Sequence, residues 1–180
     1  MALVGAIGER LGFWVFLLTG KVLPGFEPET RGMEGIKKLV RGRFSEVRQL
    51  GTAELADWLA DANRPQPQLL DVREPDEFAV SHLPGAQRID PDARGPVLED
   101  LAATNQPLVL YCSVGYRSSA LARRLLKAGR TDVFNLEGSI FQWANEGRPL
   151  VGGNGAATQI HPYGRRWRLL LKPDRRGAID

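Results

Sequence analysis

Cys112 is the only cysteine of the chain, and its position between two regular patterns indicates a nucleophile. Residues 108–111 (LVLY) have the apolar composition of a buried strand, and a helical pattern follows from Ser118. Residues 112–117 therefore form a turn that leads from a strand into a helix. We predict that Cys112 lies in this turn, at the N-terminal end of the helix.

The composition of this turn favours an ionised sulfur. The main-chain N–H groups of residues 113–118 and the positive end of the helix would surround the Cys112 sulfur, and both stabilise an anion. Gly115 can adopt the positive φ that a tight loop needs, and Arg117 adds a full positive charge. We interpret the turn as an anion-binding loop around a thiolate. The alternative is an inert, buried cysteine at the end of a core strand.

Four other residues have side chains that could take part in proton transfer. Asp71, Arg73 and Glu77 follow a strand and could act as acid or base groups, but no nucleophile lies in their segment. We favour a salt bridge that stabilises this turn. His82 could be a base for Cys112, but a histidine in a turn before Leu-Pro-Gly is more often structural.

Strands and helices alternate along the middle of the chain. Thr52 is the expected N-cap of a short helix that includes Leu59, and the next helix begins at Pro75. The expected strands are 47–50, 69–72, 87–89, 108–111 and 133–136, and the later helices are 96–103, 118–128 and 139–145. This order predicts an α/β domain with a parallel sheet covered on both faces, and places Cys112 at the carboxyl end of a central strand.

The composition limits the kinds of site that the chain can form. At 180 residues, with 43% hydrophobic and 25% charged residues, we expect one folded domain with extensions. One cysteine excludes an internal disulfide, and with only two histidines a Cys/His zinc cluster cannot be assembled. No metal and no cofactor are predicted, and no P-loop or dinucleotide fingerprint is present.

The N-terminal part, residues 1–43, is a hydrophobic and basic extension. The uncharged run between Arg10 and Lys21 has ten residues, whereas a membrane-spanning helix needs about 20. A cleaved signal is also disfavoured, because Glu9 precedes Arg10 and no clear cleavage site follows. Two interpretations stay open: residues 1–26 form a helix that packs on the domain, or one that lies in a membrane surface. Residues 24–35 are interpreted as a connector.

The C-terminal tail, residues 152–180, is basic. It begins with a glycine-rich stretch that we expect to be flexible, and six Lys or Arg residues follow. A nucleic-acid or lipid-headgroup surface is one interpretation of these charges. We favour the other, in which Trp167 and residues 169–171 anchor the tail while the arginines are solvated, and we predict no nucleic-acid partner.

Three segments together resemble the rhodanese-like family of single-domain sulfurtransferases. They are DVREPDEFAVSHLPGA (71–86), CSVGYRS (112–118) and LEGSIFQWANEGRPLV (136–151), in the order of the family. The resemblance covers about residues 47–151 and implies a three-layer domain over 44–151, with a central, mainly parallel five-stranded sheet flanked by helices. The chain departs from the family at Ser81 and Glu137, where glycine is usual, and both positions lie away from the loop.

The resemblance also implies a reaction. Cys112 would be the catalytic residue, carrying sulfur as a persulfide from thiosulfate or a similar small anionic donor to cyanide or a thiol. The donor would be bound by the rest of the loop, Ser113, Val114, Gly115, Tyr116, Arg117 and Ser118. We expect a cytoplasmic protein, membrane-associated if residues 1–26 lie in a membrane surface; the oligomeric state stays open.

Two other function classes compete with this interpretation. The domain could be a binding or sulfur-carrier module that its flanks attach to a membrane or a protein complex. It could also be a phosphatase or arsenate reductase using the same loop. The related cell-cycle phosphatases have a loop one residue longer between cysteine and arginine, so we expect the shorter loop from Cys112 to Arg117 to accept a sulfur atom and exclude a phosphoryl group.

Overall fold

A computed structural model describes residues 2–178, with side chains from residue 11 onward. Its centre is a sheet of five parallel strands in the order β1-β5-β4-β2-β3. The strands are β1 Arg48–Leu50, β2 Gln68–Asp71, β3 Gln87–Arg88, β4 Leu108–Tyr111 and β5 Val133–Leu136. The expected parallel, five-stranded α/β domain is confirmed.

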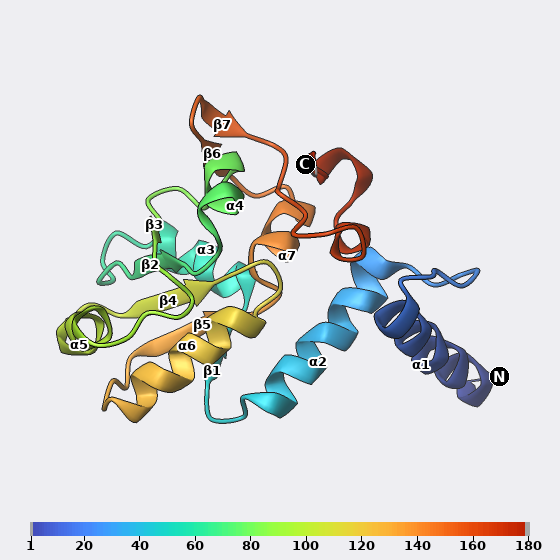
Figure 1. Cartoon of the computed structure of the whole chain (residues 1–180), viewed down its shortest axis with the longest axis horizontal. Coiled ribbons are helices and arrows are strands. Elements are labelled where there is room, and N and C mark those ends of the chain that lie inside the picture. The colour runs from blue at the N-terminus through green and yellow to red at the C-terminus, as the bar shows by residue number, and fades with distance from the viewer. Residues whose placement is uncertain (1, 179–180) are drawn as a thin grey trace.

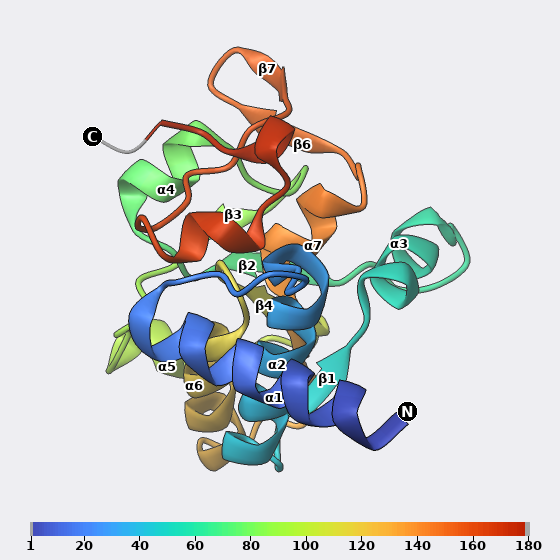
Figure 2. The ribbon, with the colours of Figure 1, turned by 90° about the vertical axis from the view of Figure 1, so that its right-hand side faces the viewer.

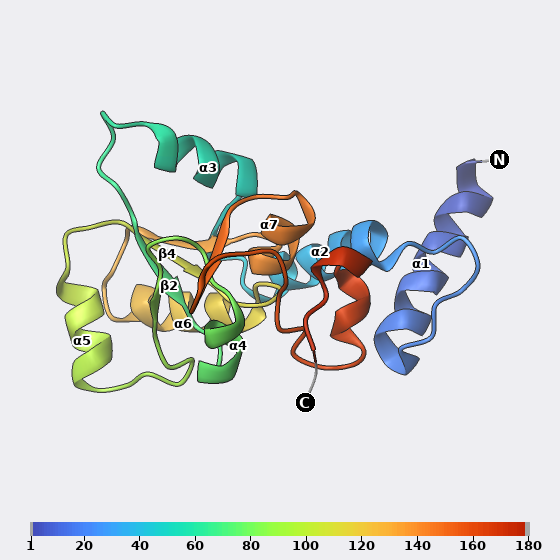
Figure 3. The ribbon, with the colours of Figure 1, turned by 90° about the horizontal axis from the view of Figure 1, so that it is seen from above.

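Helices cover both faces of this sheet, as Figure 3 shows from above. Two of them, α5 Pro96–Ala103 and α6 Tyr116–Lys127, lie on one face, and α3 Thr52–Ala60 and α7 Ser139–Asn145 lie on the other. The short α4 Pro75–Val80 follows β2. Every residue of β4 is fully buried, because this central strand has a partner strand on each side and helices above and below. Cys112 follows β4 directly, at the carboxyl end of the sheet.

Two helices begin one or two residues earlier than the sequence indicates. Helix α6 begins at Tyr116 and not at Ser118, because Gly115 adopts a left-handed conformation (φ 102°) that turns the loop directly into the helix. In α3, Thr52 is not the N-cap. Gly51 has that position and its N–H donates to the Glu54 carboxylate at 2.8 Å, while the Thr52 hydroxyl bonds to Glu146.

The N-terminal extension forms two packed helices. Helix α1 Ala2–Thr19 is followed by a π-helical turn, Pro28–Gly32, and by α2 Met33–Arg43 (Figure 1). The connector expected over 24–35 is therefore only partly irregular. Gly35 lies inside α2, although glycine often interrupts a helix. The ring of Phe13 occupies the space that a side chain at this position would need, which explains why the residue is glycine. Phe16 is fully buried, so α1 packs on the rest of the chain. No helix among residues 2–178 is long and apolar enough to cross a membrane.

The C-terminal tail is ordered along most of its length. The glycine-rich stretch expected to be flexible forms an antiparallel hairpin of β6 Leu150–Gly152 and β7 Gly155–Ala157. Two short 3-10 helices follow, Trp167–Leu170 and Pro173–Arg175. Leu170 and Leu171 are fully buried, which confirms that apolar residues anchor the tail.

The two extensions touch each other. The Arg166 guanidinium donates to the main-chain oxygen of Leu17 at 2.8 Å, and Arg176 forms an ion pair with Glu29 at 3.3 Å. Figure 2 shows α1 lying in front of α2, with the red C-terminal segment directly above them. The N-terminal and C-terminal extensions therefore meet beside the α/β domain.

Candidate active site

The loop after β4 is held in place by the beginning of α7. The Cys112 N–H donates to the Ser139 hydroxyl at 3.2 Å. The N–H groups of Ile140 and Phe141 donate to the main-chain oxygens of Cys112 and Ser113, each at 3.2 Å. Ser139 has a positive φ of 51°, which is uncommon for a residue with a side chain. The sequence analysis did not identify Ser139, and no local signal connects it with residue 112.

The surroundings of Cys112 favour a thiolate. The side chain is 1% exposed, and burial by itself disfavours the charged form. The positive charge of Arg117 and hydrogen bonds from Ser118 and Gly115 outweigh burial, so the pKa of Cys112 lies below its usual value. The Gly115 N–H lies 3.1 Å from the sulfur. Of the six predicted binding residues, these three act on the sulfur directly.

The other three predicted binding residues also belong to the loop, but none has a described hydrogen bond to the sulfur. Ser113 directs its hydroxyl to Glu77, Val114 is buried, and Tyr116 is about half exposed with its ring edge against Phe44. Their part in binding a substrate stays a prediction.

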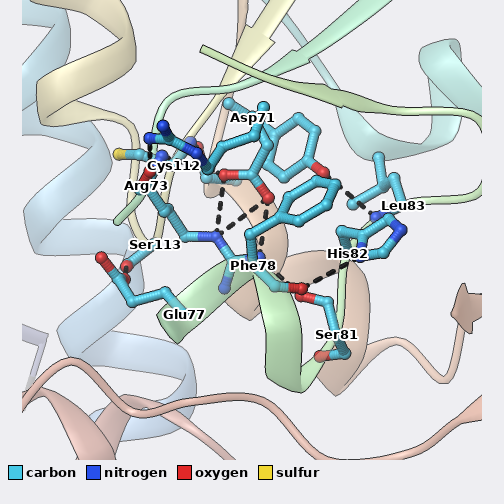
Figure 4. Close-up of polar contacts among 12 residues, drawn as sticks. Asp71, Arg73, Glu77, Phe78, Ser81, His82, Leu83, Cys112 and Ser113 are labelled. Carbon is cyan, nitrogen blue, oxygen red and sulfur yellow. Dashed lines mark hydrogen bonds and ion pairs between the residues drawn. The ribbon is translucent and has the colours of Figure 1, made fainter. Parts of the chain in front are cut away.

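Glu77 connects the turn after β2 with the cysteine loop. Its carboxylate is 1% exposed and accepts hydrogen bonds from Arg117 Nη1 at 2.7 Å, Arg117 Nη2 at 2.9 Å and the Ser113 hydroxyl at 3.0 Å. Burial raises the pKa of Glu77, but the bonds from Arg117 outweigh it and the pKa is lowered. Figure 4 shows Glu77 directed at Ser113 and away from Asp71. Glu77 therefore does not belong to the salt bridge that we expected within its own turn; it fixes Arg117.

Asp71 and Arg73 do form the expected salt bridge. Arg73 Nη2 lies 2.7 Å from Asp71 Oδ2, and both side chains are fully buried. The same nitrogen donates to the main-chain oxygen of Ser81 at 2.6 Å, which joins the end of β2 to the end of α4. These two residues stabilise the turn.

His82 has a structural environment. Its ring stacks on Phe78 with centroids 3.8 Å apart, Nδ1 lies 3.0 Å from the Phe78 oxygen, and the main chain pairs with Val151. In Figure 4, His82 lies on the opposite side of the Asp71–Arg73 pair from Cys112. The geometry agrees with the structural interpretation and gives no support to a base role.

A cavity of about 290 Å³ opens beside Cys112. The loop contributes Ser113, Val114, Tyr116 and Arg117 to its lining. The rest of the lining comes from the two extensions: Leu17, Ile36, Leu39, Val40, Tyr163 and Trp167. The sequence analysis missed all six, because their distance along the chain from residue 112 leaves no local pattern.

The fold and this loop define the class of protein. The model of the rhodanese-like domain family matches residues 52–146, and the chain belongs to this family. The chain is 31% identical over 109 residues to a sulfurtransferase of Allochromatium vinosum, which covers 61% of this chain and 99% of that protein. It is 35% identical over 78 residues to the thiosulfate sulfurtransferase GlpE of Pseudomonas aeruginosa, covering 42% of this chain and 68% of GlpE.

Other similarities are partial or show the fold alone. The chain is 38% identical over 79 residues to the uncharacterized protein YqhL of Bacillus subtilis; the match covers 44% of this chain and spans 62% of YqhL. A solved structure from Rhodopseudomonas palustris, described as a possible tyrosine phosphatase, superposes with a TM-score of 0.52 at 23% identity. That superposition covers 67% of this chain and 94% of the other, and it shows a shared fold.

Proposed function

We propose that this protein is a sulfurtransferase in which Cys112 carries the transferred sulfur. The observation that carries the proposal is the state of the Cys112 sulfur. It lies at the carboxyl end of β4, accepts the Gly115 N–H at 3.1 Å, and has a lowered pKa that increases its thiolate fraction near neutral pH. The two named sulfurtransferases among its relatives support the same class.

The reaction would proceed in two displacements. The Cys112 thiolate attacks the outer sulfur of thiosulfate, a new S–S bond forms, and the donor's own S–S bond breaks so that its electron pair leaves with sulfite. The enzyme then holds a persulfide anion. Cyanide or a thiolate attacks the outer sulfur of that persulfide, and the electron pair of the broken bond returns to Cys112.

The loop would stabilise each anion during these steps. N–H groups that already point at the sulfur need no reorganisation when negative charge moves to the persulfide. Because Nη1 and Nη2 of Arg117 already bond to Glu77, we propose that Arg117 acts mainly through its charge. This role differs from direct capture of the donor, which the sequence alone would favour.

Two measurements test the proposal. The purified protein incubated with thiosulfate should gain the mass of one sulfur atom on Cys112, and cyanide should release that sulfur as thiocyanate. Cys112→Ser should keep its fold, because a hydroxyl fits the same space, and should lose both signals. Transfer by the Cys112→Ser variant at a rate comparable with wild type would contradict the mechanism.

A binding module is the second candidate function. Leu11, Trp14 and Leu18 are 57%, 48% and 70% exposed at helical spacing along α1, and this apolar face is the observation that favours it. Its occupant would be an anionic membrane surface, since the exposed Lys21 and Lys38 lie on the same extension. Sedimentation with anionic vesicles, lost in Trp14→Gln, together with no thiosulfate turnover, would favour this function.

A further inference from the structure

The cavity beside Cys112 has walls that the family domain does not supply. Residues 52–146 match the family, whereas Leu17, Ile36, Leu39 and Val40 precede that range and Tyr163 and Trp167 follow it. All six are apolar or aromatic. The space next to the reactive sulfur is therefore shaped by parts of the chain that lie outside the family match.

Contacts between the extensions hold these walls in position. The Arg166 side chain bonds to the Leu17 oxygen at 2.8 Å, and the rings of Tyr163 and Trp167 meet edge to face at 6.5 Å. The Arg117 guanidinium lies over the Tyr163 ring, 4.6 Å from its centroid. Tyr163 has a φ of 63°, a conformation that costs free energy and persists only where surrounding contacts impose it. The wall is preorganised before any ligand binds.

The chemistry of the lining describes a particular kind of ligand. The charge of Arg117 and the loop N–H groups stabilise negative charge only at the end of the cavity that holds the sulfur. The remainder offers apolar surface. Thiosulfate, a small dianion, would leave this surface uncovered. An anion with an apolar body would place its charged end at Cys112 and its body against Leu39 and Trp167.

The size of the cavity fits such a molecule. An apolar cavity of about 150 Å³ holds one benzene molecule. The volume of about 290 Å³ therefore accommodates an aromatic ring together with the sulfur-containing head group. Each buried methylene group should raise kcat/KM about three- to fourfold through removal of apolar surface from water.

We propose that the preferred donor is an anionic sulfane-sulfur compound with an apolar organic body, such as an organic thiosulfonate. This inference rests on the proposed sulfur transfer. The Cys112 thiolate attacks the terminal sulfur of R–SO₂–S⁻, an S–S bond forms, and the bond between the donor's two sulfurs breaks. The electron pair of that bond leaves with the sulfinate R–SO₂⁻, and Cys112 is left as the persulfide anion, so charge and sulfur balance.

The test compares three donors with cyanide as the acceptor. Thiosulfate, methanethiosulfonate and benzenethiosulfonate are each assayed for thiocyanate release. We expect kcat/KM for benzenethiosulfonate to exceed that for methanethiosulfonate by about tenfold or more, because the ring fills the apolar cavity. A ratio near one would overturn the inference.

Variants of the wall make the same test specific. Leu39→Gln and Trp167→Ala should lower the benzene-to-methane ratio by about fivefold or more, since each removes apolar lining. Val22→Gln is the control, because Val22 is an exposed apolar residue of the same extension and does not line the cavity; it should keep the wild-type ratio. If the Leu39 and Trp167 variants kept that ratio as well, the apolar part of the donor would not bind against these two residues.

A binding measurement separates this inference from the proposed function. Benzenesulfinate should protect Cys112 from alkylation at lower concentrations than methanesulfinate does, and this readout requires no turnover. Preferential protection without persulfide formation from any donor would refute sulfur transfer and leave only the apolar site. Persulfide formation from thiosulfate without preferential protection would refute the apolar donor and leave sulfur transfer intact.

Discussion

The bond between Glu77 and Arg117 should contribute to both stability and loop geometry, and Glu77→Gln tests it directly. The substitution keeps the shape of the side chain and removes its charge. Glu77 is 1% exposed, and the Arg117 side chain 20%, so both groups are largely shielded from water. Breaking a buried ion pair typically costs about 3–5 kcal/mol. Because Arg117 retains some hydration, we expect a loss of about 2–3 kcal/mol.

This loss translates into an observable change in melting temperature. For a chain of this size, 1 kcal/mol corresponds to about 2–4 °C, so Tm should fall by about 4–12 °C. Arg117→Gln should cost at least as much, because it leaves the buried Glu77 carboxylate without its main partner. The double variant should lose less than the sum, with a coupling free energy of about 1–3 kcal/mol from urea denaturation.

The pH dependence of stability tests whether the ionised form of Glu77 stabilises the fold. Burial alone would raise the pKa of Glu77, but the bonds from Arg117 lower it in the folded protein. The ionised pair therefore stabilises the fold at pH values above the pKa of an unfolded glutamate, about 4.3. This contribution is lost as pH falls through the folded pKa. The stability difference between wild type and Glu77→Gln should therefore be constant near neutral pH and shrink in acid.

The control is Glu74→Gln, in the same turn. Glu74 is about half exposed and its carboxylate lies 4.0 Å from Arg117, so the substitution should change stability by no more than about 0.5 kcal/mol. If Glu77→Gln behaved like this control, or if the double variant showed additive losses, the structural role assigned to the pair would be refuted.

Three further predictions concern the loop itself. The thiolate absorbance of Cys112 should rise at a lower pH than that of an unperturbed cysteine thiol, because the Arg117 charge helps to lower the pKa, and Arg117→Gln should move the midpoint upward; an unchanged midpoint would exclude the charge effect. Gly115→Ala should destabilise by at least about 1–2 kcal/mol, because φ is 102° and the new methyl group would lie 3.1 Å from Asn135 Nδ2. Gly42→Ala, a helical site with open space, should not destabilise, and equal losses in both would contradict the argument. Aryl phosphates should not be hydrolysed above background, since a loop with arginine at this spacing is too short for a phosphoryl group; hydrolysis faster than sulfur transfer would refute the loop-size argument.

The sequence predicts the central domain well because its signals are local. Strand β4 and the helices Pro96–Ala103 and Ser139–Asn145 have the bounds that we predicted, since proline, glycine or polar residues flank each apolar run. Helix α2 was missed for a tertiary reason: Gly35 permits close contact with Phe13, which sequence alone cannot distinguish from a helix break. The hairpin after Leu150 was missed because its glycines also resemble a flexible linker.

The candidate site also contains residues that local sequence signals reveal and residues that only the folded chain brings together. The loop from Cys112 to Arg117 could be recognised because strand, turn and helix are adjacent in sequence. Glu77 was identified but given the wrong partner, since its nearest opposite charge along the chain is Arg73 and its bonded partner is 40 residues away. The apolar walls required the folded chain, because residues 17 and 166 come together across 149 positions.

This contact between the two extensions has a consequence for protein synthesis. During translation, the cysteine loop and the sheet around it can assemble once residues near 146 have left the ribosome. Tyr163 and Trp167 emerge later, and only then can Arg166 attach to α1 and complete the cavity. In a nascent chain that lacks these two residues, one wall of the cavity beside Cys112 would be missing, and small thiols and oxidants could reach the sulfur more easily. The apolar walls beside this cysteine are therefore complete only after residues 163–167 have folded back onto α1.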